Sequence, residues 1–88
     1  MTRRANARIV NPAGLHARPC HALVTCALGF ASEVRVGAGA QLVNAKSIIE
    51  LMTLGAPFGT ELVLEAEGAD EDAAIAALTA LIAGGFGE

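Results

Sequence analysis

Residues 11–19 of this chain read Asn-Pro-Ala-Gly-Leu-His-Ala-Arg-Pro, a stretch in which a turn leads directly into a helix. Pro12 fixes its own φ and Gly14 can adopt a positive φ, so the backbone can turn sharply just before His16. Pro19 is compatible with a helix only within the first turn. The stretch therefore predicts that His16 lies at the start of a helix.

The start of that helix has the chemistry of a small anion site. The backbone amides of Ala17 and Arg18 precede the first intrahelical hydrogen bonds, and the helix dipole favours negative charge there. The guanidinium of Arg18 adds a bidentate donor that suits phosphate. An imidazole beside such a site can accept a phosphoryl group and hold it, whereas many histidines at helix starts are caps or solvated surface residues. The residues alone indicate a histidine, His16, beside an anion site.

The length and composition indicate one small domain, residues 1–88, with an aliphatic core. Hydrophobic residues make up 53% of the 88 residues, with three Phe and neither Trp nor Tyr. A formal net charge of −3 argues against a broad nucleic-acid footprint. Most acidic residues follow residue 60, whereas the arginines gather in the first quarter of the chain, at Arg3, Arg4, Arg8 and Arg18. The end of the molecule that carries His16 is therefore expected to be locally positive, which suits an anionic partner.

The chain shows no feature of a membrane or secreted protein. No apolar run approaches the length of a membrane span, and the N-terminus lacks the apolar segment of a signal peptide. Cys20 and Cys26 lie on one predicted helix, separated by roughly 9 Å of helical rise and directed to different sides, so they cannot pair with each other. Free thiols are typical of a reducing compartment. We therefore expect a cytoplasmic protein without membrane insertion.

The apolar patterns predict the element order strand, helix, strand, strand, helix, strand, helix. The predicted strands span residues 3–10, 33–36, 41–44 and 60–67, and the predicted helices span residues 16–28, 46–54 and about 70–83. Gly29 is expected to end the first helix as its C′ residue, residues 37–40 form a hairpin turn, and residues 86–88 form a fraying tail. These one-sided strands and amphipathic helices indicate a two-layer α+β fold, with an antiparallel or mixed sheet covered on one face.

A second motif reads Asn-Ala-Lys-Ser-Ile over residues 44–48 and is followed by Leu54-Gly55. Together with residues 11–19, it resembles the signature segments of the HPr family, the histidine-containing phosphocarriers of the bacterial phosphoenolpyruvate-dependent sugar phosphotransferase system. The spacing of the two motifs and the element order match that family over nearly the whole length. The resemblance implies an open-faced sandwich with a four-stranded antiparallel sheet of order 1-4-2-3 and three helices on one side. It also implies a monomeric carrier without a cofactor.

The resemblance implies a role for each residue of the first motif. His16 corresponds to the histidine that phospho-enzyme I phosphorylates on Nδ1 and that passes the phosphoryl group to the IIA domains of sugar permeases. Arg18 corresponds to the arginine that assists this transfer, and Ala17 and Arg18 bind the phosphate. The partners supply most of the catalytic groups, so the chain is expected to be a carrier and not an enzyme.

Ser47 has two interpretations. It corresponds to the family's regulatory serine, which an ATP-dependent HPr kinase/phosphorylase modifies in some bacteria. Ser47 and Glu50 also stand in the S-x-x-E arrangement of a capping box, which needs no regulatory role. Glu50 would repel a phosphate three residues away, and the family position is usually not acidic, so both interpretations stay open.

The same resemblance predicts a docking surface shared by enzyme I and the IIA domains, formed by Ala17, Cys20, Ile48, Ile49 and Met52. A mixed apolar patch ringed by polar groups suits a transient partner surface. Helix geometry supports the exposure of part of it, because Ile48 and Ile49 cannot both face inward with Leu51 and Leu54. One of the two isoleucines is therefore expected to be exposed.

Several alternatives compete with the sugar-transport carrier. A paralogue of the same fold could serve a nitrogen-type or purely regulatory phosphorelay. A non-phosphorylated interaction module would keep the fold and the docking patch, but it needs neither His16 nor Arg18. His16 and Cys20 lie one helical turn apart with His21 nearby, which is too few aligned ligands for a closed metal site, so no metal is expected. Association through the open face of the sheet stays open as an alternative to the monomer.

Overall fold

The computed structural model of this chain describes residues 2–87, and it shows strands and helices in the predicted order. Met1 and Glu88, which belong to the predicted domain and tail, lie outside the described residues. The strands are β1 (Thr2–Arg8), β2 (Glu33–Ala38), β3 (Gln41–Asn44) and β4 (Glu61–Glu67). The helices are α1 (Ala17–Leu28), α2 (Ile48–Met52) and α3 (Glu71–Ala83), and a short 3₁₀ turn, η1 (Gly85–Gly87), follows them. No helix within the described range is long and apolar enough to cross a membrane.

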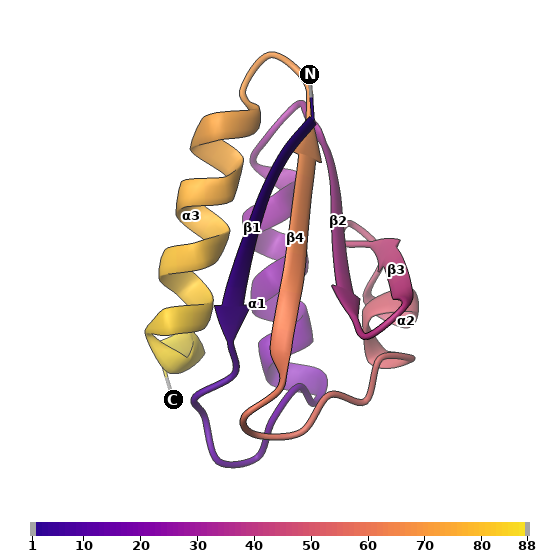
Figure 1. Cartoon of the computed structure of the whole chain (residues 1–88), viewed down its shortest axis with the longest axis vertical. Coiled ribbons are helices and arrows are strands. Elements are labelled where there is room, and N and C mark those ends of the chain that lie inside the picture. The colour runs from indigo at the N-terminus through magenta and orange to yellow at the C-terminus, as the bar shows by residue number, and fades with distance from the viewer. Residues whose placement is uncertain (1, 88) are drawn as a thin grey trace.

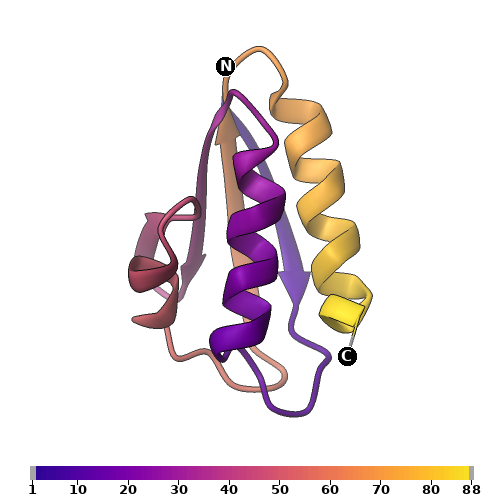
Figure 2. The ribbon, with the colours of Figure 1, turned by 180° about the vertical axis from the view of Figure 1, so that it is seen from behind.

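The four strands form one antiparallel sheet in the order β1-β4-β2-β3. Figure 1 views the uncovered face of this sheet, and Figure 2 shows α1 and α3 lying across the opposite face with α2 beside them. The open-faced sandwich and the strand order 1-4-2-3 that the resemblance implied are therefore confirmed. The loops β1–α1 and α2–β4 both lie at one end of the sandwich, and the loop β4–α3 lies at the other end (Figure 1).

The core is aliphatic and lies between the sheet and the helices. Alternate residues of β4 point toward the helices and are fully buried, as the one-sided pattern predicted; they are Leu62, Leu64 and Ala66. Burying one such leucine contributes roughly 1.5–3 kcal/mol. Phe30 and Phe86 pack at the edge of the core, whereas Phe58 is 61% exposed.

Several element ends differ from the predictions for local reasons. Predicted as residues 33–36, β2 continues through Gly37 and Ala38, because Gly37 leaves room for the close approach of the Gln41 carbonyl. The hairpin turn is accordingly shorter than predicted. Gly29 ends α1 but has φ −74°, so it is not the left-handed C′ residue that was expected. The predicted tail instead forms the turn η1 as far as Gly87.

The predicted helix of residues 46–54 is regular only over Ile48–Met52. At its start Ser47 has an extended backbone and acts as the N-cap. At its end the amides of Thr53 and Leu54 bond to the carbonyls of Glu50 and Leu51, each at 3.1 Å, which is the tighter 3₁₀ pattern.

The loops at the end opposite His16 are joined through Asp70. Its carboxylate accepts hydrogen bonds from the backbone amides of Ala31 and Ser32, both at 2.9 Å, and from the Ser32 hydroxyl. These bonds, led by the one from the Ser32 hydroxyl, hold the pKa of Asp70 below its ordinary value. Asp70 does not cap its own helix with its side chain, so it fixes the α1–β2 connection to the start of α3.

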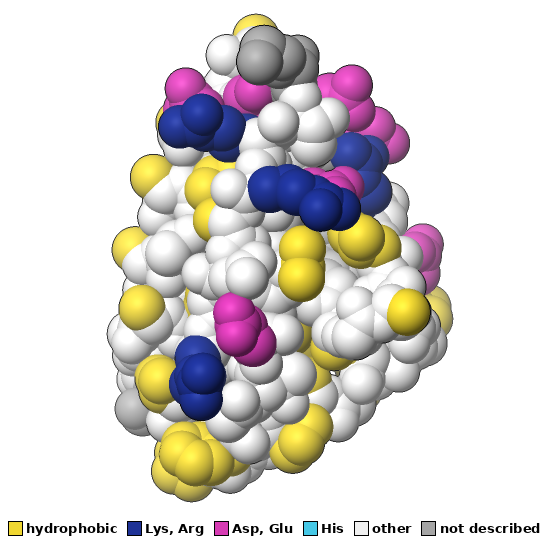
Figure 3. All heavy atoms as spheres, in the orientation of Figure 1, with side chains coloured by type: hydrophobic (Ala, Val, Ile, Leu, Met, Phe, Trp, Pro, Cys, Tyr) yellow, Lys and Arg dark blue, Asp and Glu magenta, His cyan; other side chains and the backbone are white. Residues whose placement is uncertain are grey.

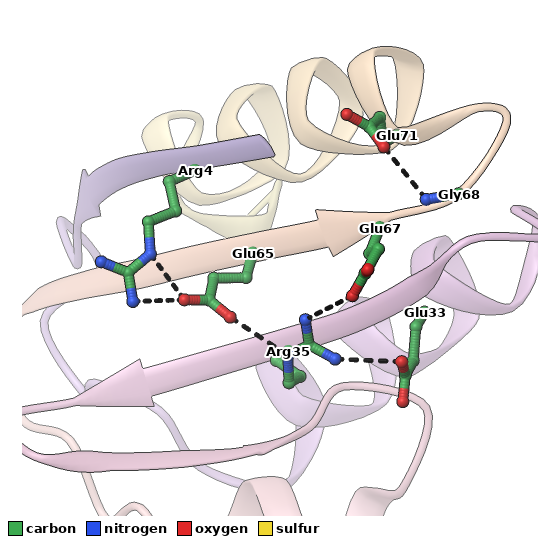
Figure 4. Close-up of polar contacts among 7 residues, drawn as sticks. All are labelled: Arg4, Glu33, Arg35, Glu65, Glu67, Gly68 and Glu71. Atoms are coloured by element: carbon green, nitrogen blue, oxygen red, sulfur yellow. Dashed lines mark hydrogen bonds and ion pairs between the residues drawn. The ribbon is translucent and has the colours of Figure 1, made fainter. Parts of the chain in front are cut away.

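The uncovered face of the sheet carries a cross-strand row of charges. Arg4, Glu65 and Arg35 occupy paired positions on β1, β4 and β2. Both arginines bind the Glu65 carboxylate, Arg4 through two nitrogens and Arg35 through Nε at 3.1 Å (Figure 4). Arg35 also contacts Glu33 and Glu67, at 3.1 and 3.4 Å. Figure 3 shows basic and acidic side chains interleaved over the upper part of this face.

Glu65 is only 9% exposed, although it points to the open face as the strand alternation predicted. The hydrogen bonds from Arg4 and then from Arg35 lower its pKa below the ordinary 4.5. The stabilisation by this carboxylate is thus fully present above pH 4.5 and is lost as the pH falls through the lower pKa of the folded state.

Glu65→Gln is expected to lower the free energy of unfolding at neutral pH by about 1 kcal/mol, because the arginines lose their charged acceptor. The variant should also lose less stability than the wild type on acidification below pH 4.5. Urea unfolding midpoints across this pH range measure both effects. Glu61→Gln on the same strand is the control, and an unchanged acid dependence in Glu65→Gln would contradict the assignment.

Candidate functional site

The loop between β1 and α1 makes a tight turn before His16. The Gly14 amide donates to the Asn11 carbonyl at 3.1 Å, and the Asn11 side-chain amide donates back to the Gly14 carbonyl at 2.7 Å. Gly14 has φ +73°, which is the left-handed conformation. This agrees with the prediction that Gly14 adopts a positive φ in the turn before His16. The next amide, that of Leu15, donates to the Ala56 carbonyl at 2.8 Å. The turn is therefore tied both to itself and to the α2–β4 loop.

His16 is the N-cap residue of α1 and is exposed to solvent. Its backbone is extended (φ −111°, ψ −166°), and its carbonyl accepts the first intrahelical hydrogen bond, from the Cys20 amide at 3.0 Å. The imidazole makes no capping hydrogen bond to the helix. His16 therefore caps the helix through its backbone carbonyl and not through its ring.

The surroundings of His16 favour an anion. Ala17 and Arg18 are exposed on the first turn, and their amides lie ahead of the first helical hydrogen bond. The next residue, Pro19, is buried and has no amide to satisfy. No acidic residue lies in the first turn of α1. The amides of the helix start, the helix dipole and the charge of Arg18 thus all lie within two residues of His16 along the chain.

Ser47 caps α2 in a way that only half matches a capping box. Its Oγ accepts a hydrogen bond from the Glu50 amide at 3.3 Å, as predicted. The Glu50 carboxylate, however, accepts from the Asn44 amide at 3.1 Å, and the Ser47 amide donates to the Asn44 carbonyl instead. The two residues therefore secure the β3–α2 connection as well as the helix start.

Ser47→Ala is expected to lower the free energy of unfolding by about 1 kcal/mol, because the Glu50 amide loses its acceptor. Ser47→Asp keeps an acceptor at the N-cap and should remain within about 0.5 kcal/mol of the wild type. Urea denaturation of the three proteins at one pH measures the difference. Equal losses in both variants would show that capping is not the source of the effect.

Part of the predicted docking surface is exposed to solvent in the structure. Ile49 and Met52 on α2 are 77% and 51% exposed, Ile48 is partly buried against the core, and Ala17 is exposed. The expectation that one of the two isoleucines is exposed is confirmed. The helices that carry these residues, α1 and α2, pack against each other and lie side by side in the helix layer (Figure 2).

Cys20 does not belong to an exposed surface, so its place in the docking prediction is wrong. The residue is fully buried, because it shares the inward face of α1 with Leu23 and Ala27 at helical spacing. Burial raises the pKa of its thiol above the ordinary value. Cys20 therefore lies in the core while His16 is exposed, and within residues 2–87 no three His, Cys, Asp or Glu side chains are grouped so that they could hold a metal ion.

The α2–β4 loop is a part of the site that the sequence reasoning missed. A Cβ at Gly14 would lie 2.7 Å from the Ala56 carbonyl oxygen and 3.1 Å from the Phe58 amide nitrogen, so the two loops are in close contact. Phe58 is 61% exposed beside this contact. The sequence contained one indication of this loop: the aromatic Phe58 follows Pro57 in a segment bounded by Gly55 and Gly59.

The structure is thus a small α+β open-faced sandwich with an exposed histidine at the N-cap of its first helix. The chain matches, over residues 4–84, the family described as "PTS HPr component phosphorylation site". It belongs to the HPr family and is thus a phosphocarrier of the phosphotransferase system. Membership of this family fits a phosphocarrier role.

Known relatives support this assignment over most of the chain. The phosphocarrier protein HPr of Neisseria meningitidis is 50% identical over 80 residues, which cover 91% of this chain and 90% of that protein. A crystal structure of HPr from Thermoanaerobacter tengcongensis superposes with a TM-score of 0.93 at 44% identity, covering 98% of this chain and 97% of that one. A multiphosphoryl transfer protein of Vibrio cholerae is 44% identical over 87 residues, which cover 96% of this chain and 22% of that protein.

Proposed function

We propose that His16 is the residue that carries the phosphoryl group. In this proposal it accepts the group from phosphorylated enzyme I and passes it to the IIA domain of a sugar permease. The observation that carries the proposal is the exposed imidazole at the N-cap of α1, which lies within the matched family segment and does not cap its helix.

The chemistry requires a nucleophile, room for a partner and a place for negative charge. An imidazole nitrogen, Nδ1 in this family, attacks the phosphorus, and the new N–P bond forms as the bond to the donor breaks. The phosphoryl oxygens then face the amides of Ala17 and Arg18 and the Arg18 guanidinium, which stabilise their charge. Since these groups are exposed, donor and acceptor proteins can approach the same atom in turn.

Partner binding is proposed for the exposed apolar side chains on the helix layer. Ile49 and Met52, with Ala17 and the edge of Ile48, form a mixed patch of the kind that suits a transient complex. The multiphosphoryl transfer protein of Vibrio cholerae supports a place in a chain of phosphoryl transfers. Ser47 is proposed as a second, regulatory phosphorylation site for an HPr kinase/phosphorylase, since its hydroxyl lies at a partly exposed helix start near this patch.

The proposal is tested by incubating the wild-type chain with labelled phosphoenolpyruvate and purified enzyme I. The expected product is a labelled protein whose phosphate is labile in acid and stable in alkali, as for a phosphohistidine, and which loses its label to an added IIA domain. An HPr of proven activity is the positive control. If that control is labelled and this chain is not, the carrier role in this relay fails and an interaction module becomes the better explanation.

The choice of IIA domain separates the sugar-transport carrier from a regulatory paralogue. A transport carrier is expected to discharge to a sugar-permease IIA domain at least as fast as to a regulatory one. Both acceptors can be tested with the same phosphorylated protein. Discharge only to the regulatory domain would assign the chain to the other branch.

A further inference from the structure

We infer that Asn11 is a positioning residue for His16, acting through the peptide group between Gly14 and Leu15. The inference rests on the proposed role of His16 as phosphoryl acceptor. Asn11 lies five positions before His16, at the start of the loop, and is 2% exposed. A buried polar side chain in a surface loop indicates a specific hydrogen-bonding role.

Asn11 and His16 both donate a hydrogen bond to the Gly14 carbonyl oxygen. The Asn11 Nδ2 donates to it at 2.7 Å, and the backbone amide of His16 donates to the same oxygen at 3.2 Å. The orientation of this carbonyl therefore determines where the His16 amide finds its acceptor. Asn11 supplies the shorter of the two bonds.

The opposite end of the same peptide group is held as well. The Leu15 amide donates to the Ala56 carbonyl at 2.8 Å, and the Leu15 side chain is buried at 6% exposure. The Gly14–Leu15 peptide is thus fixed at its oxygen by Asn11 and at its nitrogen by Ala56. Since this peptide comes directly before the Leu15–His16 bond, it sets the direction in which the chain enters α1 and presents the imidazole.

The bond to the Gly14 carbonyl requires a hydrogen-bond donor at residue 11, and this donor is shielded from water. The C-terminal turn η1 supplies part of the shield, because a Cβ at Gly85 would lie 3.9 Å from the Asn11 Cβ and 3.7 Å from a methyl of Val10. An aspartate of nearly the same shape would, as a carboxylate, offer the Gly14 carbonyl no donor. The role therefore depends on the amide and not on the volume of the side chain.

The test compares wild type, Asn11→Ala and Asn11→Asp in the enzyme I-dependent reaction, with kcat and KM measured for this chain as the substrate. Both variants are expected to lower kcat about tenfold, because the acceptor is misaligned, and to leave KM within about twofold, because the docking patch is untouched. Asp70→Ala is the control, since it removes loop hydrogen bonds at the opposite end of the molecule. It should leave both constants unchanged at a temperature where all four proteins are folded.

Each outcome separates this inference from the proposed function. An unlabelled wild type would refute the acceptor role of His16 in this relay. A labelled wild type with an unchanged kcat in the folded Asn11 variants would refute the positioning role alone, as would a loss that appears only in KM. An equal loss of kcat in Asp70→Ala would assign the effect to general destabilisation. Should Asn11→Ala not fold, Asn11→Asp, which keeps the shape of the side chain, decides the question.

Discussion

His16→Ala is expected to accept no phosphoryl group from enzyme I while folding as the wild type does. The variant removes the imidazole nitrogen on which the acid-labile N–P bond is proposed to form. Because the imidazole does not cap the helix, its removal should change the free energy of unfolding by less than about 0.5 kcal/mol. Labelling from phosphoenolpyruvate and urea unfolding of the same preparation measure the two effects.

The matched control for this variant is His21→Ala. His21 is the other histidine of the chain, it is exposed, and it lies on the same helix but on another side of it. His21→Ala should be labelled as strongly as the wild type. Acid-labile label that persists in His16→Ala and disappears in His21→Ala would place the acceptor at His21 and overturn the assignment. An acid-stable label in either variant would point to a hydroxyl such as that of Ser47.

The local features of the site could be predicted from the sequence, because they depend on neighbouring residues. Pro12, Gly14 and Pro19 restrict the backbone within a few positions of His16, and this restriction places the histidine at the helix start. The strand order could not be derived in the same way. Alternation shows which face of a strand is buried, whereas the pairing of β1 with β4 joins residues that are far apart in the sequence. Only the family resemblance supplied that order.

The parts of the site that were missed depend on such distant contacts. Cys20 was assigned to the docking surface by the family resemblance, but it lies on the inward face of α1 and is fully buried. Ala56 and Phe58 come from a loop whose contact with Gly14 leaves no periodic signal. Glu65 is buried on the open face only because arginines from both neighbouring strands cover it. Each of these is a consequence of sheet or loop packing that a linear pattern does not contain.

Gly14→Ala is expected to lower the free energy of unfolding by about 2–4 kcal/mol and to slow phosphorylation of His16. Two costs combine at this residue. An alanine at φ +73° is strained, and its Cβ would lie 2.7 Å from the Ala56 oxygen and 2.9 Å from the Pro57 Cα, both of which are backbone atoms. The clash can be relieved only if the two loops separate, and that separation would disturb the Leu15–Ala56 hydrogen bond that directs the chain into α1.

Gly39→Ala separates the two costs. Gly39 has φ +63° in the hairpin turn, and a Cβ there would meet nothing within 4 Å, so this variant should show only the backbone strain, roughly 1 kcal/mol, and normal phosphorylation. Urea unfolding of both variants gives the difference, and that difference measures the contact between the β1–α1 and α2–β4 loops. If Gly14→Ala costs no more than Gly39→Ala and is phosphorylated at the wild-type rate, the loops adapt easily to the added methyl group. The orientation of His16 would then depend on the helix start alone.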